Sequence, residues 1–493
     1  MSAGIQRDMT RGAAWMLLFK MLERSLGFIS TLFLVRLLVP ADFGIVAMAL
    51  SFIAMAEILS AFGFDLALIQ NQKALEQHYH TAWTCNLLLG LAITMLMVAA
   101  AHPIAAFYDR PDVVWVVTAL ALSPTLAGLE NIGVVAFRKE LQFRKEFGFQ
   151  LSKKLISVLV TVPLAFWLRN YWALVIGILT SRLSGMVVSY LVHPFRPRLS
   201  LLRVRDLMSF SGWMLLNNFV IFFKERTTDF VIGSLKGPSA LGLYNVSNEF
   251  SNLPLTELAA PINRALIPGF ARMQEDRQAI QAAFAFSMGS LALIVMPAAA
   301  GLCAIAPHLV PVVLGANWLD ATALMEVLAL SGALVAFHSP ICALLVAKNR
   351  PGSVAASHVV FVLALLLGLL LLLPGHGAVG AAYATLAAAI IATPAYLLQL
   401  RRHTGIRVLS VARTVARPLL AAGVMFFLVR LAAPAGGVAS VAEHALLLAT
   451  GIAVGVASYP AILVLLWLAS GRPAGVEKST LERLAQMVKR RHV

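Results

Sequence analysis

The sequence predicts an all-α integral membrane protein of about fourteen transmembrane helices. They would form two six-helix lobes around a central cavity, plus two extra C-terminal helices. Three observations predict this fold: an apolar composition, basic residues gathered in alternate loops, and an internal repeat. Of the 493 residues, 60% are hydrophobic and only 13% are charged, whereas about a quarter of the residues in soluble domains are charged. Only helices and closed barrels satisfy the backbone in lipid, and barrel-type alternation is absent from the sequence.

Apolar segments long enough to cross about 30 Å of hydrocarbon recur along the whole chain. The N-terminal segment is too polar for a cleavable signal, so we expect the first span to be retained. An even number of spans would place both termini on the same side of the membrane. The expected spans are roughly 13–38, 43–69, 81–101, 113–136, 155–168, 171–192, 208–235, 240–262, 282–306, 322–346, 354–373, 377–399, 415–432 and 444–469.

Basic residues gather in alternate connections between these spans. If the N-terminus is cytoplasmic, most of the 39 Lys and Arg residues fall on the cytoplasmic side, including those of the predicted loops 138–154 and 196–205. Cytoplasmic loops of membrane proteins carry such an excess. The pattern therefore predicts cytoplasmic termini, and it accounts for the net charge of +16 without a nucleic-acid partner. Membrane lipids are the expected partners of this basic face.

Two segments of the chain match without a gap at a shift of 198 residues. "WMLLFKMLERSLGFISTLFLVRLLVPADFG" begins at Trp15, and "WMLLNNFVIFFKERTTDFVIGSLKGPSALG" begins at Trp213. The shift places Pro40 on Pro238 and Gly44 on Gly242. Six spans separate the copies, so the repeat predicts two parallel lobes. The expected parts are an N-terminal lobe (1–195), a C-terminal lobe (196–400), helices 13 and 14 (401–470) and a basic cytoplasmic tail (471–493).

Charged residues lie in the middle of several expected spans, where one unpaired charge costs about 2.5–3.5 kcal/mol. The first span of each copy carries a cluster of mixed sign: Lys20, Glu23 and Arg24, then Lys224, Glu225, Arg226 and Asp229. Further spans carry Glu57, Asp65, Glu130, Arg182, Glu249, Glu257 and Glu326. These charges could form ion pairs that hold helices together. Alternatively, they could line a water-filled cavity in which cations, arginine above all, bind an anion such as phosphate.

The sequence gives little support for a disulfide, a metal site, an ATP site or a catalytic site. The three cysteines, Cys85, Cys303 and Cys342, resemble small apolar residues more than a disulfide or metal set. The chain has no P-loop, so direct use of ATP is not expected. His338 and His308 are the candidate bases of a membrane acyltransferase or polymerase, but neither lies in a catalytic context. We therefore expect no enzyme, no cofactor and no metal.

Several stretches of the chain resemble a known family. "LVRLLVPADFGIVAMALSFIAMAEILSAFGFDLALIQ" (34–70), "LGLYNVSNEFSNLPLTELAAPINRALIPGFARMQED" (241–276) and "LLVAKNRPG" (344–352) are similar to the Wzx-type polysaccharide flippases, above all to the colanic acid exporter subgroup. The resemblance covers roughly residues 10–400. It implies membership of the multidrug/oligosaccharidyl-lipid/polysaccharide exporter superfamily, whose fold is two six-helix lobes around a central cavity.

The resemblance implies a transporter in the bacterial inner membrane. It would flip undecaprenyl-diphosphate-linked oligosaccharides to the periplasmic leaflet by alternating access, for exopolysaccharide, capsule or O-antigen synthesis. Arg24, with Lys20, Lys224 and Arg226, would bind the diphosphate. Glu23, Glu57, Asp65, Glu225, Asp229 and Glu249 would be cavity acids available for sugar contacts or ion coupling. A polysaccharide polymerase and a chain-length regulator are candidate partners. The alternative is an ion-coupled antiporter of the multidrug and toxin extrusion type.

Overall fold

The computed structural model is helical, with no strand among the residues it describes, which are 22–58, 64–71, 73–208, 212–273, 276–436, 440–473, 475–479 and 482. This confirms the predicted all-α class. The chain divides into two compact units, residues 1–242 and 243–493. The predicted lobe boundary near residue 195 rests on the repeat and stays a prediction.

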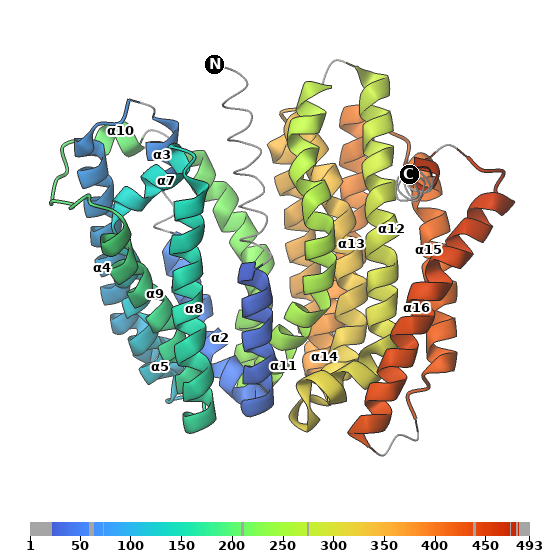
Figure 1. Cartoon of the computed structure of the whole chain (residues 1–493), viewed down its shortest axis with the longest axis horizontal. Helices are drawn as coiled ribbons and strands as arrows, with labels where there is room; N and C mark the ends of the chain where they lie inside the picture. Colours follow the sequence, from blue (N-terminus) through green and yellow to red (C-terminus); the bar gives the residue numbers. More distant parts are fainter. Residues whose placement is uncertain are drawn as a thin grey trace, which may run out of the picture. The chain divides into compact units, whose positions relative to one another are not determined.

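Unit 1 holds a set of long helices with several short ones between them (Figure 1). A first helix runs through residues 22–37. It is followed by α2 (Pro40–Glu57), α3 (Phe64–Gln70), α4 (Glu76–Phe107), α5 (Val113–Leu120), α6 (Leu122–Gly128), η2 (Ile132–Val134), α7 (Val135–Lys139), α8 (Phe143–Leu168), α9 (Trp172–Val192), α10 (Val204–Met208) and the first part of α11 (Gly212–Arg272).

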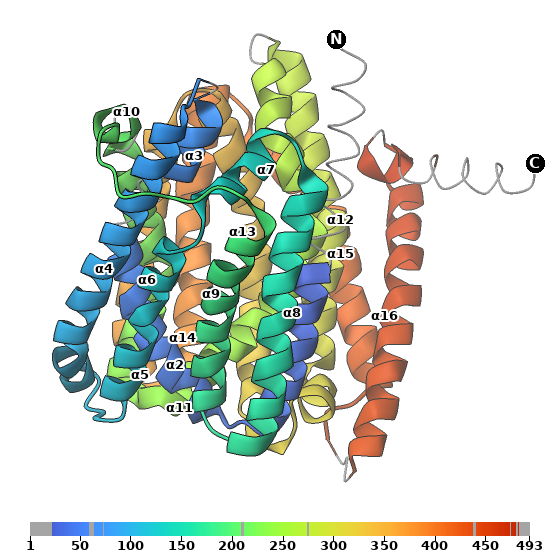
Figure 2. The same ribbon diagram turned by 60° about the vertical axis from the view of Figure 1, so that its left-hand side comes forward.

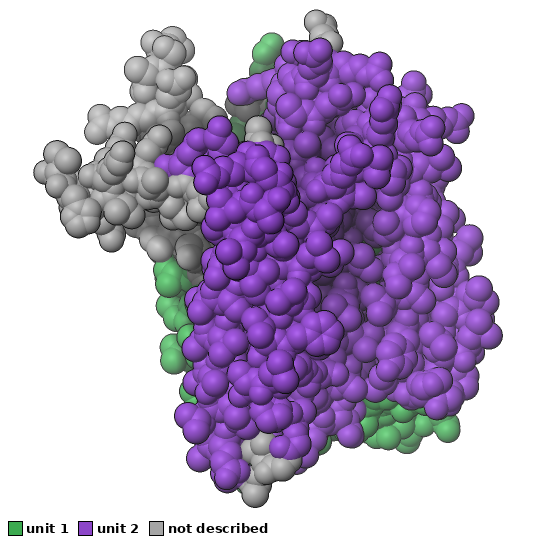
Figure 3. Space-filling view, turned by 90° about the vertical axis from the view of Figure 1, so that its right-hand side faces the viewer, with its two compact units in different colours: residues 1–242 green, residues 243–493 purple. Residues whose placement is uncertain are grey.

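Unit 2 contains the rest of α11 and the helices that follow it. These are α12 (Arg277–Leu309), the short turns η3 (Val310–Leu314) and η4 (Ala316–Trp318), α13 (Ala321–Ala347), α14 (Pro351–Thr404), α15 (Val408–Ala432) and α16 (Val441–Ala469). Helix α12 packs along both α13 and α15, so it forms the centre of this unit. Figure 3 shows unit 2 as a space-filling surface. Helix α16 packs against α12 and α15, and most of its residues are only partly covered by the rest of the chain. Its apolar surface is therefore available to lipid.

The described helices include nine that are long and apolar enough to cross a membrane, or ten if one bent pair is counted as a single span. Two of the longest helices contain a turn. Gly237 in α11 and Gly377 in α14 have positive φ angles of 75° and 58°. A Cβ built on Gly368 would lie 3.0 Å from Ala384, although a straight helix separates residues 16 apart by about 24 Å. Helix α14 is therefore a hairpin, but the total of fourteen spans stays a prediction.

Three predicted spans differ from the helices observed, and the one predicted at 43–69 contains two helices, α2 and α3. The segment predicted as one span at 113–136 is broken, and its two parts meet at an angle of 61°. Buried Asn131 holds the break: its side chain accepts a hydrogen bond from the Gly133 amide (2.9 Å) and donates one to the Phe195 carbonyl (2.7 Å). The third difference is α8, which begins at Phe143 rather than near residue 155. The predicted loop 138–154 is therefore wrong for residues 143–154, which are helical.

Glycine and small side chains allow helices of unit 1 to approach closely. Ser157 of α8 donates a hydrogen bond to the Gly177 carbonyl of α9 (3.0 Å), and the two helices run side by side in Figures 1 and 2. The closest approach joins the two repeat copies. A Cβ on Gly44 would overlap the Pro238 carbonyl, and one on Gly242 would overlap the Pro40 carbonyl. Such a reciprocal contact is what a two-fold relation between equivalent segments requires.

This contact generates a prediction about stability. We expect Gly44→Ala and Gly242→Ala each to lower the free energy of unfolding by about 1–3 kcal/mol, because the added methyl group meets backbone that cannot rotate away. Thermal unfolding of the purified protein in detergent measures the effect. Gly423→Ala is the matched control, since a Cβ on this helical glycine meets nothing within 4 Å. Equal unfolding midpoints for all three variants would contradict the prediction.

Candidate substrate-binding site

Unit 1 carries a network of charged side chains on helices that also supply its apolar core. We call the residues Glu57, Ser123, Glu130, Lys153 and Arg182 the polar network. They come from α2, α6, the break before η2, α8 and α9. Apart from the first half of α8, which carries further charges, these helices are mostly apolar. A charged residue in such a helix is stabilised by a partner of opposite sign.

Lys153 and Glu130 form the most enclosed ion pair of the network. The Lys153 ammonium lies 3.0 Å from a Glu130 carboxylate oxygen, with side-chain exposures of 18% and 23%. The ammonium also lies over the Phe149 ring, 4.9 Å from its centroid. A Cβ built on Gly185 would lie within 2.9 Å of both side chains, so this glycine in α9 provides the space that the pair fills.

Arg182 lies one helical turn before Gly185 and joins two other helices to α9. Its guanidinium donates a hydrogen bond to the Ser123 hydroxyl (3.1 Å) and lies 3.8 Å from a Glu57 carboxylate oxygen. Glu130 itself stands at the break between α6 and η2, where the chain leaves the helical path. Broken helices in membrane proteins occur where the backbone is buried in protein or lines a polar site.

Three of the six acid residues predicted for a cavity have cationic partners within 4.0 Å in unit 1. Glu57 lies beside Arg182, and Asp65 lies 3.5 Å from Arg138. Asp229, whose side chain is only 5% exposed, lies 3.1 Å from Arg226 one turn earlier in α11. It also accepts a hydrogen bond from Ser51 of α2 (3.3 Å). The pairs made by Glu57 and Asp65 fit the interpretation of the charges as ion pairs between helices, whereas the pair made by Asp229 lies within α11.

The remaining residues of the predicted site are described by their helix and their exposure. Lys20 lies outside the described residues. Glu23 and Arg24 are exposed on the helix through residues 22–37, Lys224 is half-buried on α11, and Glu225 is exposed there. Glu249 belongs to unit 2, where it is exposed on the second part of α11.

Two lysines that the sequence analysis assigned to a loop lie within a helix. Lys153 and Lys154 are 10 and 11 residues past the start of α8 at Phe143, about 15 Å along its axis. A Cβ on Gly27 would lie 3.3 Å from the Lys154 ammonium, and Arg24 is one turn from Gly27 on the same helix face. A signal was available in the sequence: the span expected at 155–168 was too short to cross a membrane, so the helix had to begin earlier.

Unit 2 contains a further ion pair between membrane helices. Arg430 of α15 pairs with Glu326 of α13 and donates a hydrogen bond to the Cys303 carbonyl of α12 (3.1 Å). Tyr459 of α16 donates one to the Leu293 carbonyl of α12 (3.1 Å). The two C-terminal helices are thus bonded to the core of unit 2.

The fold and these polar contacts define a multi-pass helical membrane protein. The family described as "Polysaccharide biosynthesis protein" matches residues 33–323. The chain belongs to this family.

Curated relatives agree with this membership, and solved structures share the fold. The lipopolysaccharide biosynthesis protein WzxC of Escherichia coli is 25% identical over 69% of this chain and 70% of the relative. The succinoglycan biosynthesis transport protein ExoT of Rhizobium meliloti is 27% identical over 66% of each chain. Among solved structures, the lipid II flippase MurJ in an inward closed conformation superposes with a TM-score of 0.72 over 92% of this chain and all of that one, at 13% identity. A multidrug resistance MATE family transporter gives a TM-score of 0.55 at 13% identity, over 78% of this chain and 94% of that one.

The enclosed ion pair can be tested by removing its charges one at a time. We expect Glu130→Gln to lower the free energy of unfolding by about 1–3 kcal/mol, because it leaves the Lys153 ammonium without its carboxylate. Combining it with Lys153→Gln should recover part of this loss, which thermal unfolding in detergent would show. The exposed pair Arg203–Asp206 (3.4 Å) is the control. The same set of single and double variants should give a coupling free energy between its two side chains below about 1 kcal/mol. Equal coupling in the two pairs would refute the structural role of Lys153–Glu130.

Proposed function

We propose that this protein flips undecaprenyl-diphosphate-linked oligosaccharide units from the cytoplasmic to the periplasmic leaflet by alternating access. The product would serve exopolysaccharide, capsule or O-antigen synthesis. Membership of the polysaccharide biosynthesis family over residues 33–323 is the observation that carries the proposal. The names of WzxC and ExoT support a role in polysaccharide synthesis and, for ExoT, in transport.

The diphosphate sets the physical problem of such a transporter. Its charges cannot cross hydrocarbon alone, whereas the isoprenoid tail can stay in lipid. Arg24 and Lys154 are the cations of unit 1 best suited to it, with Lys20, Lys224 and Arg226 as further members of the predicted set. Among the described residues, Lys154 has no carboxylate within 4.0 Å. Its ammonium therefore retains donors for phosphate oxygens, and Arg24 can add a bidentate contact.

The pairing of acids with cations favours this function over a cation antiporter. Glu57, Asp65, Glu130 and Asp229 each have an arginine or lysine within 4.0 Å. A carboxylate compensated in this way binds a cationic drug or metal ion less well. We assign the paired acids to holding the basic side chains in position and to contacting sugar hydroxyls. Glu23, Glu225 and Glu249, which are exposed, are the candidates for ion coupling.

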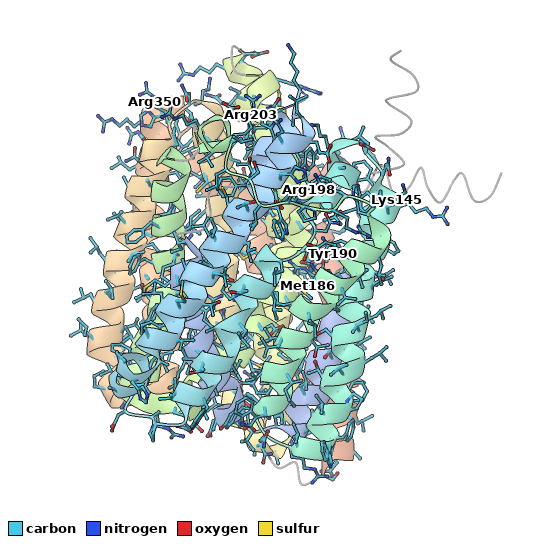
Figure 4. The ribbon with its side chains drawn as sticks, turned by 90° about the vertical axis from the view of Figure 1, so that its left-hand side faces the viewer. Lys145, Met186, Tyr190, Arg198, Arg203 and Arg350 are labelled. Carbon is cyan, nitrogen blue, oxygen red and sulfur yellow. The ribbon has the colours of Figure 1, made fainter. Side chains whose placement is uncertain are left out.

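The distribution of charge supports the proposed membrane and orientation of the transporter. We place it in the bacterial inner membrane with both termini cytoplasmic, because basic residues gather at one end of unit 1. Figure 4 shows Lys145, Arg198 and Arg203 toward that end, with Tyr190 and Met186 further along the membrane helices. On this proposal the protein is a transporter and not an enzyme. A polysaccharide polymerase and a chain-length regulator are the partners that would receive the flipped unit.

The test follows the lipid-linked saccharide in the host. Deleting the gene should cause undecaprenyl-diphosphate oligosaccharide to accumulate and surface polysaccharide to be lost. Complementation with the wild type should restore both. Arg24→Ala and Lys154→Gln should each reduce export about tenfold or more, the loss expected for one charge-assisted contact.

Arg144→Gln is the matched control for Lys154→Gln. It removes one positive charge from the same helix, ten residues away, where the side chain is exposed, and it should complement fully at equal membrane expression. Full activity of Lys154→Gln and Arg24→Ala would remove these residues from the diphosphate site and leave the flippase intact. No accumulation in the deletion strain, together with new sensitivity to toxic cations, would overturn the flippase in favour of the antiporter.

A further inference from the structure

Unit 2 contains a cavity of about 450 Å³ that no step of the proposed transport uses. It lies between the first turns of α12, the turn that joins α14 to α15, and the first turns of α15. Arg277, Gln281, Arg407 and Ser410 supply polar groups to its wall. Phe284, Ala285, Met288 and Val411 supply apolar ones.

Two arginines give the cavity its charge. The side chains of Arg277 and Arg407 are exposed, and neither forms an ion pair with any residue that the structure describes. The nearby carboxylates are already engaged. Asp276 accepts hydrogen bonds from the amides of Gln278 and Ala279, both at 2.9 Å, and Glu477 pairs with Arg417 at 3.1 Å. Among the residues that the structure describes, the two cavity arginines therefore have no carboxylate partner.

Arg277 lies against the turn that follows α14. Gly405 ends α14 with a positive φ of 71°, and a Cβ built on it would overlap the Arg277 guanidinium. Arg407 is the residue before the first turn of α15 and gives that helix no side-chain cap. The α15 amides at this end add to the positive potential of the same wall.

Polar and apolar groups are separated along the cavity. Arg277 and Met288 are 11 residues apart on α12, which is about 16 Å along the helix axis. Arg277 is the first residue of α12 and Arg407 directly precedes α15, whereas most of the apolar side chains lie further along these two helices. A free phosphate ion would use only the arginine end, whereas a lipid with a phosphate headgroup matches both ends.

We propose that this cavity binds the phosphodiester headgroup of an acidic phospholipid, with Arg277 and Arg407 on the phosphate and the start of an acyl chain along Phe284, Met288 and Val411. Guanidinium groups bind phosphate oxygens through paired hydrogen bonds. Acidic headgroups are abundant beside basic faces of membrane proteins. A lipid in this position would contact α12, the α14–α15 turn and α15 together, so it would stabilise their packing.

The test measures lipid binding to the purified full chain by native mass spectrometry, with phosphatidylglycerol and phosphatidylcholine as probes. The wild type should bind phosphatidylglycerol at least about tenfold more tightly than phosphatidylcholine. The double variant Arg277→Gln/Arg407→Gln should lose most of this preference. Arg402→Gln/Arg413→Gln removes the same charge from exposed positions of α14 and α15 outside the cavity and should keep it.

Two further experiments distinguish a lipid headgroup from free phosphate as the ligand and distinguish loss of the site from misfolding. Phosphatidylglycerol should raise the thermal unfolding midpoint of the wild type, whereas inorganic phosphate at the same concentration should not. Ala285→Phe fills the apolar part without changing the charge and should weaken phosphatidylglycerol binding. An equal loss in both double variants, an equal shift with inorganic phosphate, or unchanged lipid binding by Ala285→Phe would each overturn the proposal.

Discussion

The need to pair charged side chains inside apolar helices governs the arrangement of unit 1. An isolated lysine or glutamate in a membrane costs about 2.5–3.5 kcal/mol, so a neighbour of opposite sign stabilises it. Lys153 and Glu130, 3.0 Å apart, hold α8 against the broken segment between α6 and η2. Arg182 ties α9 to α2 and α6. Because each pair joins different helices, the polar network fixes which helices are neighbours, and the apolar packing follows.

The same pairing separates cations that stabilise the fold from cations available to a ligand. Arg138, Lys153, Arg182 and Arg226 each have a carboxylate close by. Lys154 lies beside Gly27 of the first helix instead, and it is the next residue after a paired lysine. One turn of α8 therefore carries both Lys153, whose charge stabilises the helix packing, and Lys154, whose ammonium is suited to binding an anion. Unit 2 shows the same division, with Arg430 paired to Glu326 and the cavity arginines unpaired among the described residues.

Much of the fold could be predicted because hydrophobic length is a local property. The described helices coincide with the expected spans at α4, α9, α12, α13, α15 and α16, and the turns at Gly237 and Gly377 separate spans that were predicted as separate. The errors came where polar residues enter a helix. The sequence analysis assigned Lys153 and Lys154 to a loop, although the span 155–168 was then too short to cross a membrane. It assigned Asn131 to a straight span, although the Asn131 side chain stabilises a break in the helix.

The sequence by itself determined the membrane class, the family, the repeat of Pro40 and Gly44 at Pro238 and Gly242, and the presence of charges within spans. These follow from composition and spacing along one chain. Only the tertiary structure decided which charges meet. Glu130 and Lys153 are 23 residues apart and Arg182 and Glu57 are 125 apart in sequence, so no helical period relates them. Their contacts depend on how the helices pack, and helix packing is set by side chains on several helices at once.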